Sequence, residues 1–164
     1  MALVLPAAAD DRKTCDEGTG DAAIAACTRA IASGQFAGLD LAKLHTNRGV
    51  ELKRKGDLDG AIADYDQAIQ LNPGDHFAFN NRANTWRDKG DLDRAIADYT
   101  EALRLDPGYT AVYINRGLVY ERKRELALAR ADYEAALARP PKYANGPGGQ
   151  EMARRRLREL SKNP

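Results

Sequence analysis

Apolar side chains recur along this 164-residue chain at the three- and four-residue spacing of amphipathic helices. Over residues 58–71 one helix face collects Leu58, Ala61, Ile62, Tyr65, Ala68 and Ile69. Another apolar helix is predicted before it, over residues 41–55, and Gly56-Asp57 separates this first helix from the second. Glycine favours the backbone conformation that ends a helix, and aspartate can cap the next helix. Asn72-Pro73-Gly74 ends the second helix, because proline cannot continue it.

This helix-turn-helix unit recurs with a period of 34 residues. Tyr65, Tyr99 and Tyr133 stand 34 positions apart, each at the end of the phrase Ala-Ile-Ala-Asp-Tyr or a close copy of it. A fixed period of this length indicates one supersecondary unit repeated in space. The sequence therefore predicts an all-α array of antiparallel helix pairs, which must stack to cover their apolar faces.

Small residues mark the places where helices approach closely. Gly49, Ala83 and Gly117 repeat once per unit in the first helix, while the tyrosines repeat in the second. Each of these small residues is expected to mark a spot where a neighbouring backbone comes close.

The spacing of these residues resembles the tetratricopeptide repeat, whose motif places large and small residues at fixed positions of two helices. The second repeat supplies the motif residues Phe79, Arg82, Ala83, Trp86, Ala95, Tyr99 and Pro107. The copies span about residues 42–143, with the third repeat ending at Pro141. The resemblance implies a right-handed superhelical α-solenoid and a non-catalytic scaffold that binds a peptide or partner helix in a concave groove.

Two sets of charged residues repeat where the family motif has other residues. The sets are Arg48, Arg82 and Arg116 on first helices and Asp64, Asp98 and Asp132 on second helices. We expect arginines and aspartates to form structural ion pairs within or between repeats, and a ligand site is the alternative. Our hypothesis is that such partly buried pairs specify register more than they add stability.

In this family the first helices line the groove, so its positions can be carried over to this chain. The expected groove residues are Lys43, Asn47, Val50, Arg54, Phe77, Asn80, Asn81, Asn84, Arg87, Ile114, Asn115, Leu118 and Arg122. The repeated asparagines can grip a peptide backbone, or they can brace neighbouring helices. One subgroup of the family binds acidic C-terminal peptides through a clamp of Lys, Asn, Asn, Lys and Arg, and only Asn81 matches that set. The mixed groove favours a moderately hydrophobic peptide or a partner helix.

The ends of the array depart from the period. Residues 23–31 resemble residues 61–69 at an offset of 38, with Cys27 in the tyrosine position, so they predict a half-repeat whose first helix is reduced or lost. We predict a signal-peptide remnant or disordered arm (1–14), the degenerate half-repeat (15–39) and three repeats (40–74, 75–108, 109–142). A loop and a capping helix follow over 143–164. The helix is predicted over Gln150–Leu160, with Met152, Leu157 and Leu160 covering the last repeat.

Two cysteines bear on the compartment. Cys15 and Cys27 lie 12 positions apart without a C-x-x-C pair, and His45 and His76 are remote, so no metal site and no cofactor are predicted. A disulfide between them would tether the N-terminal arm, and two reduced thiols in a cytoplasmic protein are the alternative. The apolar stretch before Ala7-Ala8-Ala9 resembles the end of an export signal. We therefore expect a periplasmic or secreted protein.

Charge and motifs argue against other functions. The net charge of +1 favours neither nucleic acid nor membrane, and no run approaches the ~20 apolar residues of a membrane span. No nucleophile motif or phosphate-binding loop occurs, so we predict no enzyme. Four arginines, Arg154, Arg155, Arg156 and Arg158, make the last helix basic. We interpret them as the solvated face of a cap, with an anionic partner as the alternative. A self-associating homo-oligomer remains the alternative function.

Overall fold

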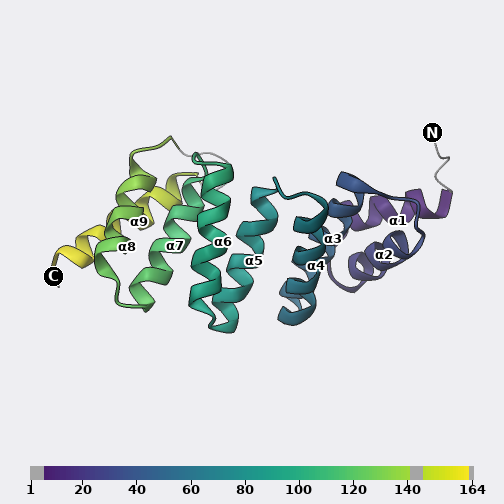
Figure 1. The fold of residues 1–164 in the computed structure, drawn as a ribbon, viewed down its shortest axis with the longest axis horizontal. Coiled ribbons are helices and arrows are strands. Elements are labelled where there is room, and N and C mark those ends of the chain that lie inside the picture. Colours follow the sequence, from purple (N-terminus) through teal and green to yellow (C-terminus); the bar gives the residue numbers. More distant parts are fainter. Residues whose placement is uncertain (1–5, 141–145, 163–164) are drawn as a thin grey trace. The chain divides into compact units, whose positions relative to one another are not determined.

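The computed structural model describes residues 6–140 and 146–162, and all regular structure in these ranges is α-helical (Figure 1). In chain order the helices are α1 (Pro6–Glu17), α2 (Gly20–Ala32), α3 (Gly38–Arg54), α4 (Leu58–Leu71), α5 (His76–Lys89), α6 (Leu92–Leu105), α7 (Thr110–Arg122), α8 (Leu126–Leu137) and α9 (Gly146–Lys162). The first repeat comprises α3 and α4, the second α5 and α6, and the third α7 and α8. The predicted all-α array of helix pairs is confirmed.

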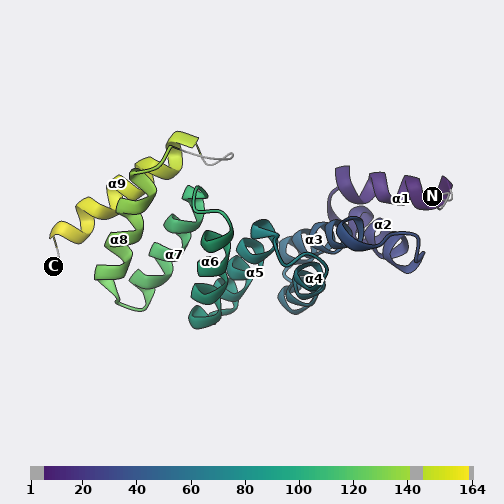
Figure 2. The ribbon, with the colours of Figure 1, turned by 45° about the horizontal axis from the view of Figure 1, so that its top comes forward.

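The chain forms two compact units, residues 1–85 and 86–164, and the boundary between them falls within α5. In the first unit α1, α2 and α3 pack on one another, and α3 packs on α4. In the second unit α7 packs on α6 and α8, and α9 lies alongside α8 (Figure 2). Each unit is described by itself below.

The turn between the two helices of a repeat follows the predicted chemistry in the first two repeats. Gly56 and Gly90 have φ values of 87° and 89°, in the left-handed region that glycine adopts readily. Asp57 then accepts a hydrogen bond from the Gly60 backbone N–H at 2.9 Å, which caps α4. Asp91 caps α6 in the same way.

The third repeat uses different residues at this turn. Arg124 has a φ of 60°, although a side chain makes the left-handed region unfavourable. Glu125 makes no capping hydrogen bond with its side chain. This turn therefore combines backbone strain with a missing cap.

Glycine allows each buried tyrosine to lie against the first helix of its own repeat. A Cβ added to Gly49 would stand 2.8 Å from Cε1 of Tyr65, and one added to Gly117 would stand 2.7 Å from Cε1 of Tyr133. Both tyrosines are fully buried. In the first and third repeats a tyrosine ring therefore lies against the glycine, whereas the sequence predicted the close approach of a neighbouring backbone.

Two of the expected ion pairs are present as forked contacts within a repeat. Arg48 donates to Asp64 through Nε and Nη2, both at 2.7 Å. Arg116 donates to Asp132 through the same two atoms, at 2.9 and 2.8 Å. Each pair joins the first helix of a repeat to the second. Arg82 and Asp98 belong to different units, and their pairing stays a prediction.

Nη1 of each repeated arginine bonds to the second helix of the preceding helix pair, a role that the sequence did not predict. Arg48 donates to Thr28 at 3.1 Å, Arg82 to Asp66 at 2.5 Å, and Arg116 to Thr100 at 2.8 Å. The acceptors directly follow Cys27, Tyr65 and Tyr99, so they share one register. The arginines therefore join successive helix pairs as well as the helices of one pair.

The N-terminal end differs from the prediction. Residues 6–14, interpreted as a signal remnant or disordered arm, lie in the helix α1, and the half-repeat therefore has a first helix. Its alanine-rich start favours helix, and Ala8 and Cys15 are buried in the packed N-terminal helices. The signal-peptide interpretation stays a prediction, and residues 1–5 lie outside the described part of the chain.

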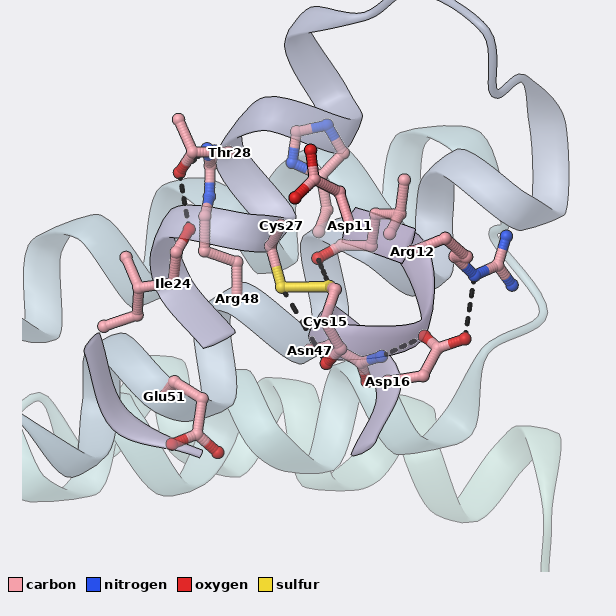
Figure 3. Close-up of a disulfide and its surroundings, with 12 residues drawn as sticks. Asp11, Arg12, Cys15, Asp16, Ile24, Cys27, Thr28, Asn47, Arg48 and Glu51 are labelled. Atoms are coloured by element: carbon pink, nitrogen blue, oxygen red, sulfur yellow. Dashed lines mark hydrogen bonds and ion pairs between the residues drawn. A yellow bond between two sulfur atoms is a disulfide. The ribbon is translucent and has the colours of Figure 1, made fainter. Parts of the chain in front are cut away.

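The structure contains the predicted disulfide, which joins Cys15 of α1 to Cys27 of α2 (Figure 3). Polar contacts then hold α1 against α3: Arg12 donates to Asp40 at 3.2 Å, and Asn47 donates to Asp16 at 2.8 Å. The disulfide sits in a small core with Leu44 of α3. It therefore tethers α1, as expected, and also supports α3.

Helix α9 caps the third repeat and starts at Gly146, earlier than the predicted Gln150. Ala153 and Leu160 are buried against α7 and α8, and Leu157 packs beside them. Met152 was expected to cover the repeat but is 38% exposed. The earlier start gives α9 an additional turn. Pro141 and the first residues of the predicted loop lie outside the described ranges.

Candidate interaction face

Three adjoining hollows follow α3 in the first unit. The Leu39 hollow, about 400 Å³, is lined by α3 and by the chain around Phe77. The Asp16 hollow, about 320 Å³, lies between α3 and the end of α1. The Tyr65 hollow, about 200 Å³, lies among α3, α4 and α5. Asn47 lines the first two hollows, and Val50 and Arg54 line the last two, so the hollows form one surface, here called the α3 face.

Most of the groove residues expected in the first unit lie on this face. The expected residues that line its hollows are Lys43, Asn47, Val50, Arg54, Phe77, Asn81 and Asn84. Leu39 and Phe77 are 60% and 40% exposed, so the Leu39 hollow has an apolar rim. The expected residues therefore share one hollowed surface, and their role in binding a ligand stays a prediction.

For two residues the prediction of a groove position is wrong, because their side chains are buried. Asn80 is 7% exposed, and Ile114, which stands 34 positions later, is 5% exposed. Ile114 packs with Ala129, Tyr133 and Leu160 in the core under α9. In the second and third repeats this register position therefore faces the packed interior of its unit.

The other expected groove residues belong to the second unit. Leu118 is partly buried against the same core as Ile114. Arg122 donates to the carbonyl oxygen of Arg87 at 3.2 Å, and the Arg87 side chain contacts Asp88 at 3.0 Å. Asn115 is half-buried. These contacts link the residues to their own unit, and their ligand role stays a prediction.

The repeated asparagines do not all behave alike. Asn47 braces α1, because its amide donates to Asp16 at 2.8 Å (Figure 3). Asn81 instead lines the Tyr65 hollow. For Asn47 the bracing alternative is therefore observed, while Asn81 has the position required for contact with a ligand.

The hydroxyl of Tyr65 is a buried polar group without a hydrogen-bond partner among the described residues. Burial raises the pKa of this hydroxyl, and the nearby Asp64 carboxylate raises it further, so the group keeps its proton and can donate. The charges of Arg54 and Glu51 also act on the hydroxyl. An unpaired hydroxyl in the interior is unfavourable, which makes this position unusual.

Glu51, which is 6% exposed, is one of the charged residues that line the Asp16 hollow. Its carboxylate accepts from the backbone N–H of Gly20 at 2.8 Å and pairs with Arg54. Glu51 therefore fixes the start of α2 and holds one of the cations on the α3 face.

Sequence reasoning placed Tyr65 in the structural core and did not include it among the ligand-binding candidates. A signal was available, because the position of Lys53 holds Arg87 in the second repeat and Glu121 in the third. A change of charge at one register suggests that the repeats differ in what this position contacts.

Other site types find little support in the described residues. No group of three or more His, Cys, Asp or Glu side chains in residues 6–140 and 146–162 could hold a metal ion. Within the same ranges no helix has the length and apolar character needed to cross a membrane.

The arginines of α9 are all paired with carboxylates. Arg154 and Arg158 contact Glu151, Arg155 contacts Glu159, and Arg156 contacts Glu121 and Glu159. Pairing reduces the net positive charge of the helix surface, which favours the interpretation of α9 as a cap. Binding of an anionic partner or nucleic acid there is untested.

Solved structures with similar folds include two peptide-bound domains. The first TPR of Spaghetti (RPAP3), bound to HSP90 peptide SRMEEVD, is 25% identical with a TM-score of 0.67, over 79% of this chain and 97% of that one. The TPR2B domain of yeast Sti1, in complex with pHsp70, is 25% identical with a TM-score of 0.68, over 75% of this chain and 98% of that one. Both similarities cover nearly the whole of the matched domain.

A tetratricopeptide repeat protein from Parabacteroides merdae ATCC 43184 matches 96% of this chain and 59% of that one, with 21% identity and a TM-score of 0.76. No curated protein matches the chain. The tetratricopeptide repeat model of protein families matches residues 46–110 and 80–144, which together exceed half of the chain. The helix pairs, their period and these matches agree, and the chain belongs to the tetratricopeptide-repeat family.

Proposed function

We propose that this protein is a non-catalytic interaction scaffold that binds an extended segment of a partner protein along the α3 face. The tetratricopeptide fold and the peptide-bound neighbours support a protein-interaction scaffold. The observation that carries the finer proposal is the row of three adjoining hollows. Asn47 lines the Leu39 and Asp16 hollows, and Val50 and Arg54 line the Asp16 and Tyr65 hollows.

The composition of the face suits a segment with both apolar and polar groups. Leu39 and Phe77 expose apolar surface at one end. Lys53, Arg54 and Asn81 supply charge and hydrogen-bonding groups at the other end. Apolar pockets supply area, and a few polar groups fix orientation and specificity.

A display library of random ten-residue peptides tests the proposal. Peptides selected on the wild-type protein should bind Val50→Trp at least about tenfold more weakly, because the indole fills the two hollows that Val50 lines. The matched control is Gln67→Trp, which places the same side chain at an exposed position of α4. Both variants should keep the wild-type melting temperature within a few degrees.

The outcomes of the selection separate cleanly. Equal affinity for Val50→Trp and wild type would place binding elsewhere, and failure to enrich any peptide would remove the proposed function. Self-association through the terminal helices instead predicts a mass that rises with concentration in light scattering.

We also infer that the protein works in the periplasm or is secreted, since a buried disulfide supports an oxidising compartment. Alkylation of the protein in intact cells, followed by mass spectrometry, should find no free thiol. Two alkylated cysteines would instead indicate the reducing cytoplasm.

A further inference from the structure

The first helix of the N-terminal half-repeat, α1, buries very little apolar surface. Among the α1 side chains that the structure describes, Ala8 and Cys15 are the buried ones. By contrast α7, the first helix of the third repeat, buries Val112, Ile114 and Val119. Burial of an alanine removes much less apolar area from water than burial of a branched aliphatic side chain. Packing alone therefore gives α1 little of the stabilisation that holds α7 in place.

The surface contacts of α1 add little to this. They are made by charged and amide side chains: Arg12 with Asp40 and the ring of Phe36, Asp16 with Asn47, and Asp11 with Arg29. The side chains of Asp40 and Arg29 are each 60% exposed, and ion pairs at exposed positions contribute little because water screens them. A helix of 12 residues is also too short to be stable in water by itself. Docking of α1 therefore needs a further tether.

The disulfide supplies that tether at the register of the tyrosines. Tyr65 and Tyr133 fill this position in the first and third repeats and lie against a glycine of the first helix. In the half-repeat the position holds Cys27, which is bonded to Cys15 of α1 (Figure 3). A covalent bond therefore does here what a packed tyrosine does in those repeats. The short cross-link also lowers the entropy cost of docking, because it keeps α1 next to α2.

The neighbouring helix α2 is held by contacts that do not involve the disulfide. It packs directly on α3. Arg48 of α3 donates to Thr28 at 3.1 Å, and Glu51 of α3 accepts from the backbone N–H of Gly20 at 2.8 Å. Loss of the disulfide should therefore free α1 and leave α2 in place on α3.

The end of α1 forms one side of the Asp16 hollow. Residues 15–19 line the hollow opposite Asn47 and Val50 of α3. Cys15 is itself one of these lining residues, so the disulfide lies directly beneath the surface of the α3 face. Asn47 also loses its bond to Asp16 when α1 leaves. The state of the disulfide therefore decides whether the α3 face is complete.

We propose that the Cys15–Cys27 disulfide is a redox lock on α1. Oxidation docks α1 and completes the Asp16 hollow, and reduction releases α1 while α2, α3 and α4 stay folded. When the lock closes, the two thiols give up two protons and two electrons to a disulfide oxidant, which becomes two thiols. A dithiol reductant reverses the reaction and becomes a cyclic disulfide. The consequence for binding rests on the proposed function: the protein acquires its complete α3 face in an oxidising compartment.

Hydrogen exchange measured by mass spectrometry tests the lock without a ligand. Oxidised wild type is compared with wild type in dithiothreitol, after its mass has confirmed that both cysteines are free thiols. Amides of α1 should exchange at least about tenfold faster in the reduced protein, whereas amides of α4 should keep their rates. Unchanged protection of α1 would overturn the lock. Loss of protection in α4 would also overturn it, because the disulfide would then hold the whole first unit.

The matched control is Cys15→Ala/Cys27→Ala, which keeps two small apolar side chains in place and cannot be cross-linked. Exchange of α1 in this variant should match that of reduced wild type and should not respond to dithiothreitol. Protection of α1 in this variant would show that packing is sufficient to dock the helix, and the proposal would then be wrong.

Peptides without cysteine, selected on oxidised wild type, test the consequence for binding. Reduction should weaken their binding at least about fivefold, because the wall formed by residues 15–19 is lost. Equal affinity in the two states, with α1 released, would overturn the link between the lock and the α3 face while leaving peptide binding intact. If the oxidised protein binds no peptide, the proposed function fails, and the exchange experiment still decides whether the lock exists.

Discussion

The first and third repeats contain the same packing elements but differ in what surrounds the tyrosine. Each has a glycine against the tyrosine ring and an arginine-aspartate fork between its helices. In the third repeat α9 supplies Arg156, and the tyrosine hydroxyl is bonded through Glu121. In the first repeat the hydroxyl has no partner among the described residues and lies in a repeat whose α3, α4 and α5 line a hollow. Similar packing therefore surrounds a hydrogen-bonded hydroxyl in one repeat and a hydroxyl without such a bond in the other.

The ion pairs of the two repeats differ in a related way. Asp64 accepts from Arg48 and also contacts Nδ1 of His45 at 2.8 Å. In the third repeat Tyr113 replaces the histidine, and the guanidinium of Arg116 lies 5.9 and 5.8 Å from the ring centroids of Tyr113 and Tyr120. The first repeat therefore adds a partner to the carboxylate, whereas the third surrounds the cation with aromatic rings.

The largest expected effect is the loss of Asp64. Asp64→Ala should lower the free energy of unfolding by about 3–5 kcal/mol, because it leaves Arg48 without its carboxylate in a mostly buried position. Asp132→Ala should cost less, because the Arg116 guanidinium still lies against two aromatic rings. Urea unfolding measures both. A larger loss for Asp132→Ala would contradict the comparison.

Acid pH provides a control for the Asp64 prediction. Burial alone would raise the pKa of Asp64, but hydrogen bonds from Arg48 and His45 outweigh it and hold the pKa below its usual range. The stabilisation is therefore present above the unfolded-state pKa of about 3.9 and is lost as pH falls through the lower folded-state value. The stability difference between wild type and Asp64→Asn should shrink below about pH 4.

Removal of the disulfide should have the next largest effect and should act on the first unit. Cys15→Ser/Cys27→Ser should lower the free energy of unfolding by about 2–3 kcal/mol through the loss of a short cross-linked loop. Hydrogen exchange should rise in α1 and α2 and stay unchanged in α7–α9. Increased exchange in α9 would contradict the prediction that the disulfide stabilises only the first unit.

Tyrosine-to-phenylalanine variants test the comparison of the two hydroxyls. Tyr133→Phe should cost about 1–2 kcal/mol, because it removes a hydrogen bond to the charged Glu121. Tyr65→Phe should not destabilise the protein, since its hydroxyl has no hydrogen-bond partner in the part of the chain that the structure describes. Thermal unfolding of the two variants gives the answer, and equal losses would show that Tyr65 has a partner inside the protein.

The smallest expected effect concerns the turn within each repeat. Arg124→Gly should stabilise the protein by about 0.5–1 kcal/mol, because glycine relieves the left-handed strain at φ 60°. The converse change, Gly56→Arg, should destabilise it by about 1–2 kcal/mol. Denaturant midpoints measure both. A destabilising Arg124→Gly would mean that the Arg124 side chain makes a favourable contact.

The sequence predicted those features that depend on local spacing. The bounds of α4, its Asp57 cap and the two ion pairs follow from a period that repeats residue by residue. Helix α1 was missed because it lacks the repeat motif and is held by Cys15 and by contacts with α3.

The chemistry of the site was harder to predict. The family register distinguishes the helices that line a groove, but burial of Asn80 and Ile114 depends on the neighbouring helices. The unpaired Tyr65 hydroxyl follows from the residue 12 positions earlier, which is Lys53 there and Glu121 before Tyr133. The repeat period alone does not predict such a pair, because this register holds a different residue in each repeat: Lys53, Arg87 and Glu121.

The central claim is that partner segments bind along the α3 face, and chemical-shift mapping tests it most directly. A selected peptide should be titrated into ¹⁵N-labelled wild-type protein. The account predicts that the largest amide shifts fall in residues 39–54 and 75–84, with small shifts on the exposed side of α4. Largest shifts on the exposed side of α4, or in α9, would contradict it.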